Sequence, residues 1–459
     1  METKKLAEFL LTIQPETLDD RTVNYAKMCV EDLVGVAIAG SAAEVGAIWT
    51  QYSLAEPIAP GASGAVCWNG SLTRAEYRTA AAYNAACGHL MDLDDLHNSS
   101  IAHLAAVTVP AAVALGQKLH SSGREVLVAI VAGYEAGARV GEAINPEAYW
   151  FWHTTGVVGS YASAVAAGKL LGLEEEQLLS ALGNSGTQSA GLWEFMENGS
   201  MSNSLHTANA TLCGLRAAEL AKLGFTGSHT ILEGRKGFVK ALSHNGHLNA
   251  ITDGLGTEPY KILSNSFKPY ACCRHTHSAN ACVQWMNEHY KIDPAQIVSI
   301  TDRTYQLAID LANAPTPTTP YSYKFSIQYC IAAMLLYGTL DETVFTPERT
   351  DASEIQVLMA KIRVVLDEEI QAAFAQNPNQ WPHVLEIHME DGQVYTHRVD
   401  FPPGDFMNPF SWEDEDRKFQ QITAGVLPEA QGQRLMEKIR EMETLKDVNA
   451  LFTAEYEKG

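Results

Sequence analysis

The sequence predicts a mainly α-helical protein, in which a large all-helical domain is joined by a smaller α+β domain inserted before the C-terminal helices. Up to about residue 265, long Ala-rich stretches show helical spacing and almost no alternating strand pattern. After Pro269, alternating segments rich in β-branched residues begin, and helical spacing returns beyond the breaker at 402–404. Since 459 residues exceed the usual size of one hydrophobic core, we expect two domains, at 1–267 with 404–459 and at 268–403.

In the first part of the chain, apolar and small residues recur at helical intervals. Thr17 or Asp19 can cap the first of these helices, and the alanines at 80–86 permit close helix packing. The predicted helices span 19–39, 73–87, 107–120, 124–143, 158–171, 175–182 and 209–223.

In the second part, strands are expected at 297–305, 362–366, 383–388 and 393–399, the last two joined across the turn signal Asp391-Gly392. Helical segments at 278–289, 324–336 and 351–360 lie between them. The acidic tail at 412–456 again has helical spacing, so we expect it to pack with the helical domain.

The charge balance restricts the class of partner. With 54 acidic residues against 32 Lys and Arg, the net charge is −22, so nucleic acid and anionic membranes are poor partners. The N-terminus has no cleavage signal and no window reaches eighteen uninterrupted apolar residues, which favours a soluble, cytoplasmic protein. The eight cysteines form no CxxC pair, which argues against a disulfide scaffold or a zinc ribbon.

The segment GHLMDLDDLHNSSIAH at 88–103 concentrates acids and histidines among apolar residues. Desolvation and neighbouring like charges would shift their pKa values, which makes Asp92, Asp94, Asp95, His97 and His103 the first catalytic candidates. The alternative is an exposed acidic loop that leads into the next helix. Their spacing matches no zinc or calcium motif, and no phosphate-binding glycine motif occurs, so we predict neither a metal nor a cofactor.

Two other segments supply candidate substrate contacts. His153 precedes a predicted helix, whose free N–H groups can bind a carboxylate, although Thr154 or Thr155 can equally be a plain cap. Tyr149 lies nearby and can supply a phenol or cover the core.

The segment at 266–281 gathers cations in an otherwise acidic protein. Lys268 and Arg274, with His275 beside them, can bind substrate carboxylates, and a desolvated Lys268 can act as a base. Alternatively, these cations pair with acids at the domain junction.

Four ordered motifs together resemble those of the MmgE/PrpD family, over essentially the whole chain. They are GHLMDLDDLH with His103, HTTGVVGSYASAVAAGKLLGL, SLHTANATLCGLRAAELAKLGFTG with ILEGRKGF, and FKPYACCRHTH. Members include 2-methylcitrate dehydratase, cis-aconitate decarboxylase and iminodisuccinate epimerase, which act on small di- or tricarboxylates without metal or organic cofactor. The resemblance implies an α+β lid domain and a homodimer.

By this resemblance the catalytic residues fall on Asp92, His103, His153, Lys268 and Tyr329. The sequence departs from the family pattern at two positions, where Leu96 replaces a threonine and Asn203 replaces a lysine. Both departures weaken the case for cis-aconitate itself as substrate.

The expected function is a cofactor-independent lyase that abstracts a proton α to a carboxylate. We expect Asp92 to orient His103, His103 or Lys268 to remove the proton, and His153 or Tyr329 to donate one. The predicted substrate-binding residues are Arg274, His275, Asn203 and Tyr149. The alternatives are an epimerase of an aminosuccinate- or iminodisuccinate-like acid and a catalytically degenerate carboxylate-binding protein.

Overall fold

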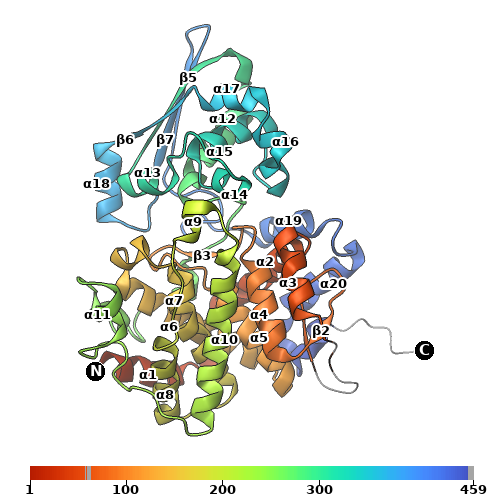
Figure 1. The fold of residues 1–459 in the computed structure, drawn as a ribbon, viewed down its shortest axis with the longest axis vertical. Coiled ribbons are helices and arrows are strands. Elements are labelled where there is room, and N and C mark those ends of the chain that lie inside the picture. Colours follow the sequence, from red (N-terminus) through yellow and green to blue (C-terminus); the bar gives the residue numbers. More distant parts are fainter. Residues whose placement is uncertain (57, 59–63, 453–459) are drawn as a thin grey trace. The chain divides into compact units, whose positions relative to one another are not determined.

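The computed structural model describes residues 1–56, 58 and 64–452, which form two compact units (Figure 1). The first unit comprises Met1–Leu90, Asp94–Ser266 and the chain from Ser411 onward, and the second comprises Met91–Leu93 and Phe267–Phe410. The protein is mainly helical with small sheets, as predicted. The last residues of the predicted helical tail, from 453 to 456, lie outside the described residues.

The first unit is built almost entirely of helices, with two short strand pairs. Its helices are α1 (Glu2–Thr12), α2 (Asp20–Ser41), α3 (Glu44–Ser53), α4 (Tyr77–Gly88), α5 (Ala105–Leu119), α6 (Gly123–Ile144), α7 (Thr154–Leu170), α8 (Glu175–Gly186), α9 (Phe195–Asn198), α10 (Ser202–Lys222), α11 (Phe238–Leu242), α19 (Trp412–Thr423) and α20 (Glu429–Arg440). Strands β1 (Ala65–Val66) and β2 (Arg74–Ala75) pair antiparallel, as do β3 (Leu96–His97) and β4 (Asn265–Ser266).

Small residues let the central helices approach closely. Helix α7 packs against α6, α5 and α10 (Figure 1). A Cβ added to Gly133 of α6 would lie 2.4 Å from Thr108 Cγ2 and 2.8 Å from the Ala162 carbonyl oxygen, so only glycine fits there. The Ala-rich composition seen in the sequence therefore sets the spacing of the helices that carry the site.

The helix boundaries differ from the predicted ones where local composition is ambiguous. Helix α7 begins at Thr154 rather than at 158, which makes His153 its N-cap residue. Helix α10 begins at Ser202 rather than at 209 because tertiary packing overrides the low helix propensity of its first residues. Helices α1 and α3 were not predicted.

A single helix long and apolar enough to cross a membrane is not found among the described residues. Helices α2 and α3 meet at a bend of 92°. Only the two together have the length and apolar composition of a membrane-spanning segment.

The second unit combines a four-stranded sheet with short helices. Its strands are β5 (Ile297–Thr304), β6 (Ile362–Leu366), β7 (His383–Met389) and β8 (Val394–Val399), in the order β6-β5-β7-β8. The β5–β6 pair is parallel and the other pairs are antiparallel. Its helices are α12 (His277–His289), α13 (Gln306–Ala312), α14 (Pro320–Tyr323), α15 (Ile327–Tyr337), α16 (Pro347–Thr350), α17 (Ser353–Met359) and α18 (Glu368–Gln376).

All four predicted strands are present, and α12 packs on β7 and β8. The hairpin between β7 and β8 turns at Asp391-Gly392, where Gly392 has φ +87°. Glycine adopts a positive φ at little energetic cost. The turn therefore favours glycine at this position, which accounts for the Asp-Gly signal in the sequence.

Candidate functional site

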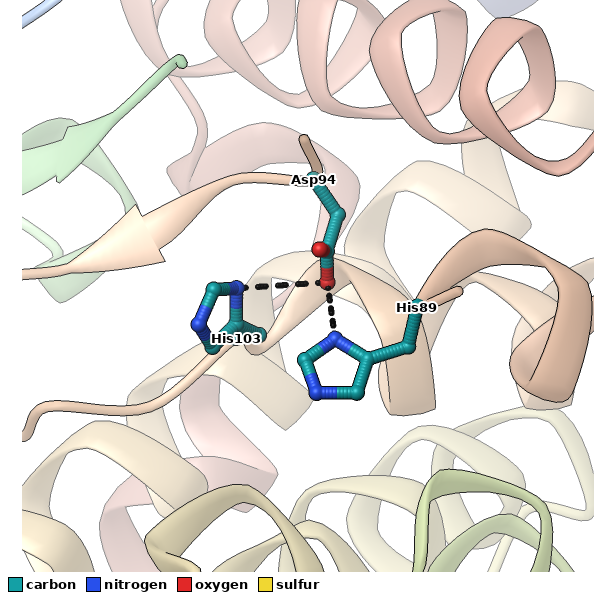
Figure 2. Close-up of side chains that lie close together, drawn as sticks. All are labelled: His89, Asp94 and His103. Carbon is teal, nitrogen blue, oxygen red and sulfur yellow. Dashed lines mark hydrogen bonds and ion pairs between the residues drawn. The ribbon is translucent and has the colours of Figure 1, made fainter. Parts of the chain in front are cut away.

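Two histidines of the first unit share one buried carboxylate (Figure 2). The Nδ1 atom of His89 lies 2.7 Å from Oδ2 of Asp94, and the Nδ1 atom of His103 lies 3.2 Å from the same oxygen. Asp94 and His89 are buried, whereas the His103 side chain is 13% exposed. His103 is therefore the member of this trio that a small molecule can reach.

The two histidines of the trio lie at helix termini, and the aspartate lies before a short strand. His89 is the C-cap residue of α4, and Asp94 lies just before β3. His103 lies two residues before α5, and its backbone N–H donates to the Thr155 hydroxyl, 3.0 Å away in the first turn of α7. Two helix termini and a short strand thus bring one carboxylate and two imidazoles together.

Two more histidines extend the trio, and we call His89, Asp94, His103, His153 and His206 the histidine cluster. The His153 ring stacks on that of His89, with centroids 5.2 Å apart and planes at 14°. Its Nδ1 lies 3.1 Å from Nδ1 of His206 on α10, so one of these nitrogens donates a proton and the other accepts it. The backbone N–H of His153 donates to the Gly191 carbonyl oxygen at 3.0 Å.

Three members of the histidine cluster have shifted pKa values, which leave one of them charged and two of them neutral at neutral pH. Burial alone would raise the pKa of the Asp94 carboxyl, but the adjacent His89 and His103 hold it well below its ordinary value. Burial, assisted by the neighbouring His89, lowers the pKa of His206 to about 4 and that of His153 well below its ordinary range. At neutral pH Asp94 is therefore ionised, and His153 and His206 are uncharged.

The ionised Asp94 lies beside the Nδ1 atoms of both His89 and His103. It therefore favours the tautomer of each neutral ring in which Nδ1 carries the proton. When Nδ1 of a neutral imidazole carries the proton, Nε2 keeps its lone pair. Nε2 of His103 lies on the side of the ring away from Asp94, where it is available for proton transfer (Figure 2). Asp94 would also stabilise the imidazolium formed when that nitrogen takes up a proton.

The trio also has the donor atoms of a metal site, since its ligand atoms all lie within 4.8 Å of one another. Tetrahedral coordination with bonds of about 2.0–2.1 Å would separate neighbouring ligand atoms by about 3.3 Å. The 2.7 Å separation of His89 Nδ1 and Asp94 Oδ2 is instead a hydrogen-bond distance. The geometry between His89 and Asp94 is therefore that of a hydrogen bond and not that of two ligands on one metal ion.

In the second unit, the ammonium of Lys268 lies 2.8 Å from Oδ1 of Asp92, and both side chains are buried. Asp92 has φ +52°, a left-handed conformation that aspartate tolerates better than most residues. Lys324 donates to the Met91 carbonyl oxygen at 2.8 Å and pairs with Glu342. Two lysines thus hold the three-residue segment Met91–Leu93.

The prediction that Asp92 orients His103 is wrong. Asp94 is the carboxylate at His103, and Asp92 is the ion-pair partner of Lys268. The misassignment arose because a run of aspartates gives no indication of which carboxylate faces which partner.

The other cationic residues of this region have partners inside the second unit. Nη2 of Arg274 lies 2.8 Å from Oδ2 of Asp405, so its acidic partner is in the same unit rather than across the domain junction, as the structural alternative expected. The His275 ring stacks on Trp381 with centroids 4.3 Å apart, and its Nδ1 is 2.6 Å from the Tyr305 hydroxyl. Burial lowers the pKa of His275 to about 3, so it is uncharged at neutral pH.

The other three candidate residues lie outside the histidine cluster. Tyr329 is buried, and its hydroxyl donates to the Val344 carbonyl oxygen. Asn203 is buried in the first turn of α10. Tyr149 lies in a 3₁₀ turn at Glu147–Trp150 and meets the Trp193 ring edge-on at 5.2 Å.

Sequence reasoning left His89 and His206 out of the candidate site. His89 was hidden because it ends an Ala-rich helix and resembles an ordinary cap. His206 has a signal in the sequence, since it follows Asn203 by three residues and so lies on nearly the same face of α10.

Two family models match consecutive parts of the chain. Residues 4–250 match the MmgE/PrpD N-terminal domain, and residues 270–444 match the MmgE/PrpD C-terminal domain.

Among curated proteins, the chain is 25% identical to cis-aconitate decarboxylase of Homo sapiens over 467 residues, covering 98% of this chain and 94% of that protein. It is 26% identical over 406 residues to a cis-aconitate decarboxylase-like protein of Aspergillus oryzae, covering 82% and 81%. It is also 26% identical over 412 residues to cis-aconitate decarboxylase of Aspergillus terreus, covering 81% and 80%. Because the two family models together match nearly the whole chain, this protein belongs to the MmgE/PrpD family.

Proposed function

We propose that the protein is a cofactor-independent lyase that acts on a small di- or tricarboxylate, as a dehydratase or a decarboxylase. The observation that carries the proposal is the partly exposed His103, whose Nδ1 faces the ionised Asp94. This pair supplies a base at Nε2 and a means of stabilising the resulting imidazolium. The curated relatives named as cis-aconitate decarboxylases support the reaction class.

Dehydration and decarboxylation can both use His103. In dehydration, His103 takes the proton α to a carboxylate, and the β-hydroxyl leaves as water after accepting a proton from a second donor. In decarboxylation, His103 first takes up a proton from water. The bond to the departing carboxylate then breaks, CO₂ leaves, and the electron pair left on carbon takes that proton from the His103 imidazolium. His153, which lies 3.1 Å from His206 through their Nδ1 atoms, is the proposed second donor. Since its imidazole is uncharged at neutral pH, it has to take up a proton from water before it gives one to the leaving hydroxyl.

We include Lys268 among the substrate-binding residues because of chain connectivity. Its partner Asp92 is separated from Asp94 only by Leu93, so covalent geometry keeps the two Cα atoms within about 7 Å of each other. A cation near a developing enediolate lowers the barrier to carbanion formation. Arg274 and Tyr329, which have internal partners, have weaker claims to direct substrate contact than Lys268.

The test is incubation in D₂O with citrate-, methylcitrate-, aconitate- and aminosuccinate-type acids, followed by NMR. We expect alkene or CO₂ from at least one acid, and a loss of about 10²–10⁴-fold in turnover for His103→Ala. The matched control is His247→Ala, because His247 is exposed and distant in sequence from the histidine cluster.

Two outcomes would contradict the lyase proposal. Exchange of the α-proton with no net product would identify an epimerase. Ligand binding without exchange or product, unchanged in His103→Ala, would identify a carboxylate-binding protein.

A further inference from the structure

Beside the histidine cluster, the first unit contains a cavity of about 570 Å³, a size typical of small-molecule sites. We call it the α10 cavity, because the first turns of α10 form part of its wall. Its walls include Trp152, Gly191, Leu192, Phe195, Leu205 and His206. None of the proposed catalytic residues lies in this wall, so the mechanism above does not account for the cavity.

The α10 cavity is joined to the proposed proton donor through its wall. His206 lines the cavity and also makes the 3.1 Å contact with Nδ1 of His153. Trp152 precedes His153 in the chain and forms an isolated antiparallel β-bridge with Leu192. The carbonyl oxygen of Gly191 accepts a hydrogen bond from the His153 backbone N–H. A ligand group in the cavity would therefore lie one side chain away from His153.

The chemistry of the wall disfavours a carboxylate. Among the described residues that line the cavity, Glu194 is the one acid, and none is a lysine or an arginine. Burial lowers the pKa of His206 to about 4, so the histidine in the wall brings no positive charge at neutral pH. Leu192 and Leu205 are 52% and 55% exposed on this wall, although large apolar side chains are usually covered.

We propose that the α10 cavity binds an uncharged, largely apolar substituent of the substrate, so that the enzyme prefers alkyl-substituted dicarboxylates to tricarboxylates. This inference rests on the proposed function and specifies its substrate class. Each methylene buried against Leu192 and Leu205 should raise kcat/KM about fourfold, as expected for the transfer of one methylene from water. A carboxymethyl group would instead meet Glu194 without a compensating cation.

The first test compares malates that carry hydrogen, methyl, ethyl, propyl or carboxymethyl at C2, the last of these being citrate. We expect kcat/KM to increase along the alkyl series and to be lowest for the carboxymethyl compound. A preference of the wild-type enzyme for the carboxymethyl compound would overturn the inference while leaving the lyase proposal intact.

The second test places a cation in the cavity wall. Leu205→Arg should raise kcat/KM for the carboxymethyl compound relative to the propyl compound by at least about tenfold, because a charge-assisted hydrogen bond becomes available. The matched control is Leu223→Arg, since Leu223 is 84% exposed at the opposite end of α10. An equal effect of both variants on this ratio would overturn the inference.

A binding measurement tests the preference of the cavity independently of catalytic turnover. Propylsuccinate and carboxymethylsuccinate lack the leaving hydroxyl, so calorimetry reports their affinity without turnover. Tighter binding of propylsuccinate, reversed in Leu205→Arg, supports the inference even when no acid is turned over, a result that would count against the proposed function alone. Equal affinities for the two compounds would overturn it.

The other possible occupant of the cavity is a second copy of the chain. Light scattering on wild type and Leu205→Arg tests this. Loss of an oligomer in the variant, with an unchanged ratio between the propyl and carboxymethyl compounds, would assign these leucines to an interface and overturn the inference.

Discussion

The two units use buried polar groups in different ways. In the helical unit, Asp94 faces two imidazoles, and the partly exposed His103 keeps one ring nitrogen for chemistry. In the α+β unit, Arg274 is paired with Asp405, and His383 places one ring nitrogen 2.9 Å from Asp302 and the other 2.8 Å from the His275 carbonyl oxygen.

Burial and charge alone therefore do not identify a functional site. In the α+β unit, each of these groups has at least one partner inside the unit, although Nε and Nη1 of Arg274 are buried without a hydrogen-bond partner among the described residues. The network of the helical unit is open on one side, at His103. Breaking the open network should affect turnover most, and breaking the contacts inside the α+β unit should affect stability most.

The largest expected effect is on turnover. Asp94→Asn removes the charge that selects the tautomers of His89 and His103 and stabilises the imidazolium, so kcat should fall by about 10²–10⁴-fold. Steady-state kinetics on the best acid of the panel measures the change. A loss of less than tenfold in a folded variant would show that Asp94 does not support the base.

The next effect is on stability. Lys268→Met leaves the buried Asp92 without its partner and should lower the free energy of unfolding by about 3–5 kcal/mol, measured by urea denaturation. Adding Asp92→Asn should restore part of that loss. The matched control is Lys4→Met, whose exposed pair with Glu175 should contribute little. A destabilisation no larger than that of the control would show that the buried pair is not required.

A third prediction concerns pH. Unfolded histidine titrates near 6.5, whereas burial lowers the pKa of His206 to about 4. Between these values only the unfolded chain binds the proton, so the free energy of unfolding falls as pH falls from about 6.5 to about 4. His206→Gln should therefore weaken this pH dependence, measured by urea denaturation at several pH values. The exposed His247→Gln should leave it unchanged, and an equal slope in both variants would contradict the assignment.

The smallest effect is expected at the β7–β8 turn of the α+β unit. Gly392 has φ +87°, and a Cβ added there would meet no described atom within 4 Å, so Gly392→Ala should cost about 1–2 kcal/mol through backbone strain alone. Thermal unfolding measures the loss. Turnover should be unchanged, and a fall in kcat of the size expected for Asp94→Asn would contradict the contrast drawn between the units.

From the amino-acid sequence alone it was possible to predict the mainly helical fold, the four strands of the sheet, the turn at Gly392 and the family. These features depend on local periodicity, turn chemistry and the order of motifs, all of which a single chain displays. The sequence also singled out the acidic segment that contains Asp94 and the histidine at the start of α7.

Only the tertiary structure decided which carboxylate faces which partner. Asp92, which has φ +52°, pairs with Lys268, whereas Asp94 lies beside the two imidazoles. Likewise, His206 reaches His153 because α10 packs against α7, from residues 53 positions apart in the chain. Contacts of this kind depend on how helices pack and where each side chain points, and no spacing along the sequence encodes them.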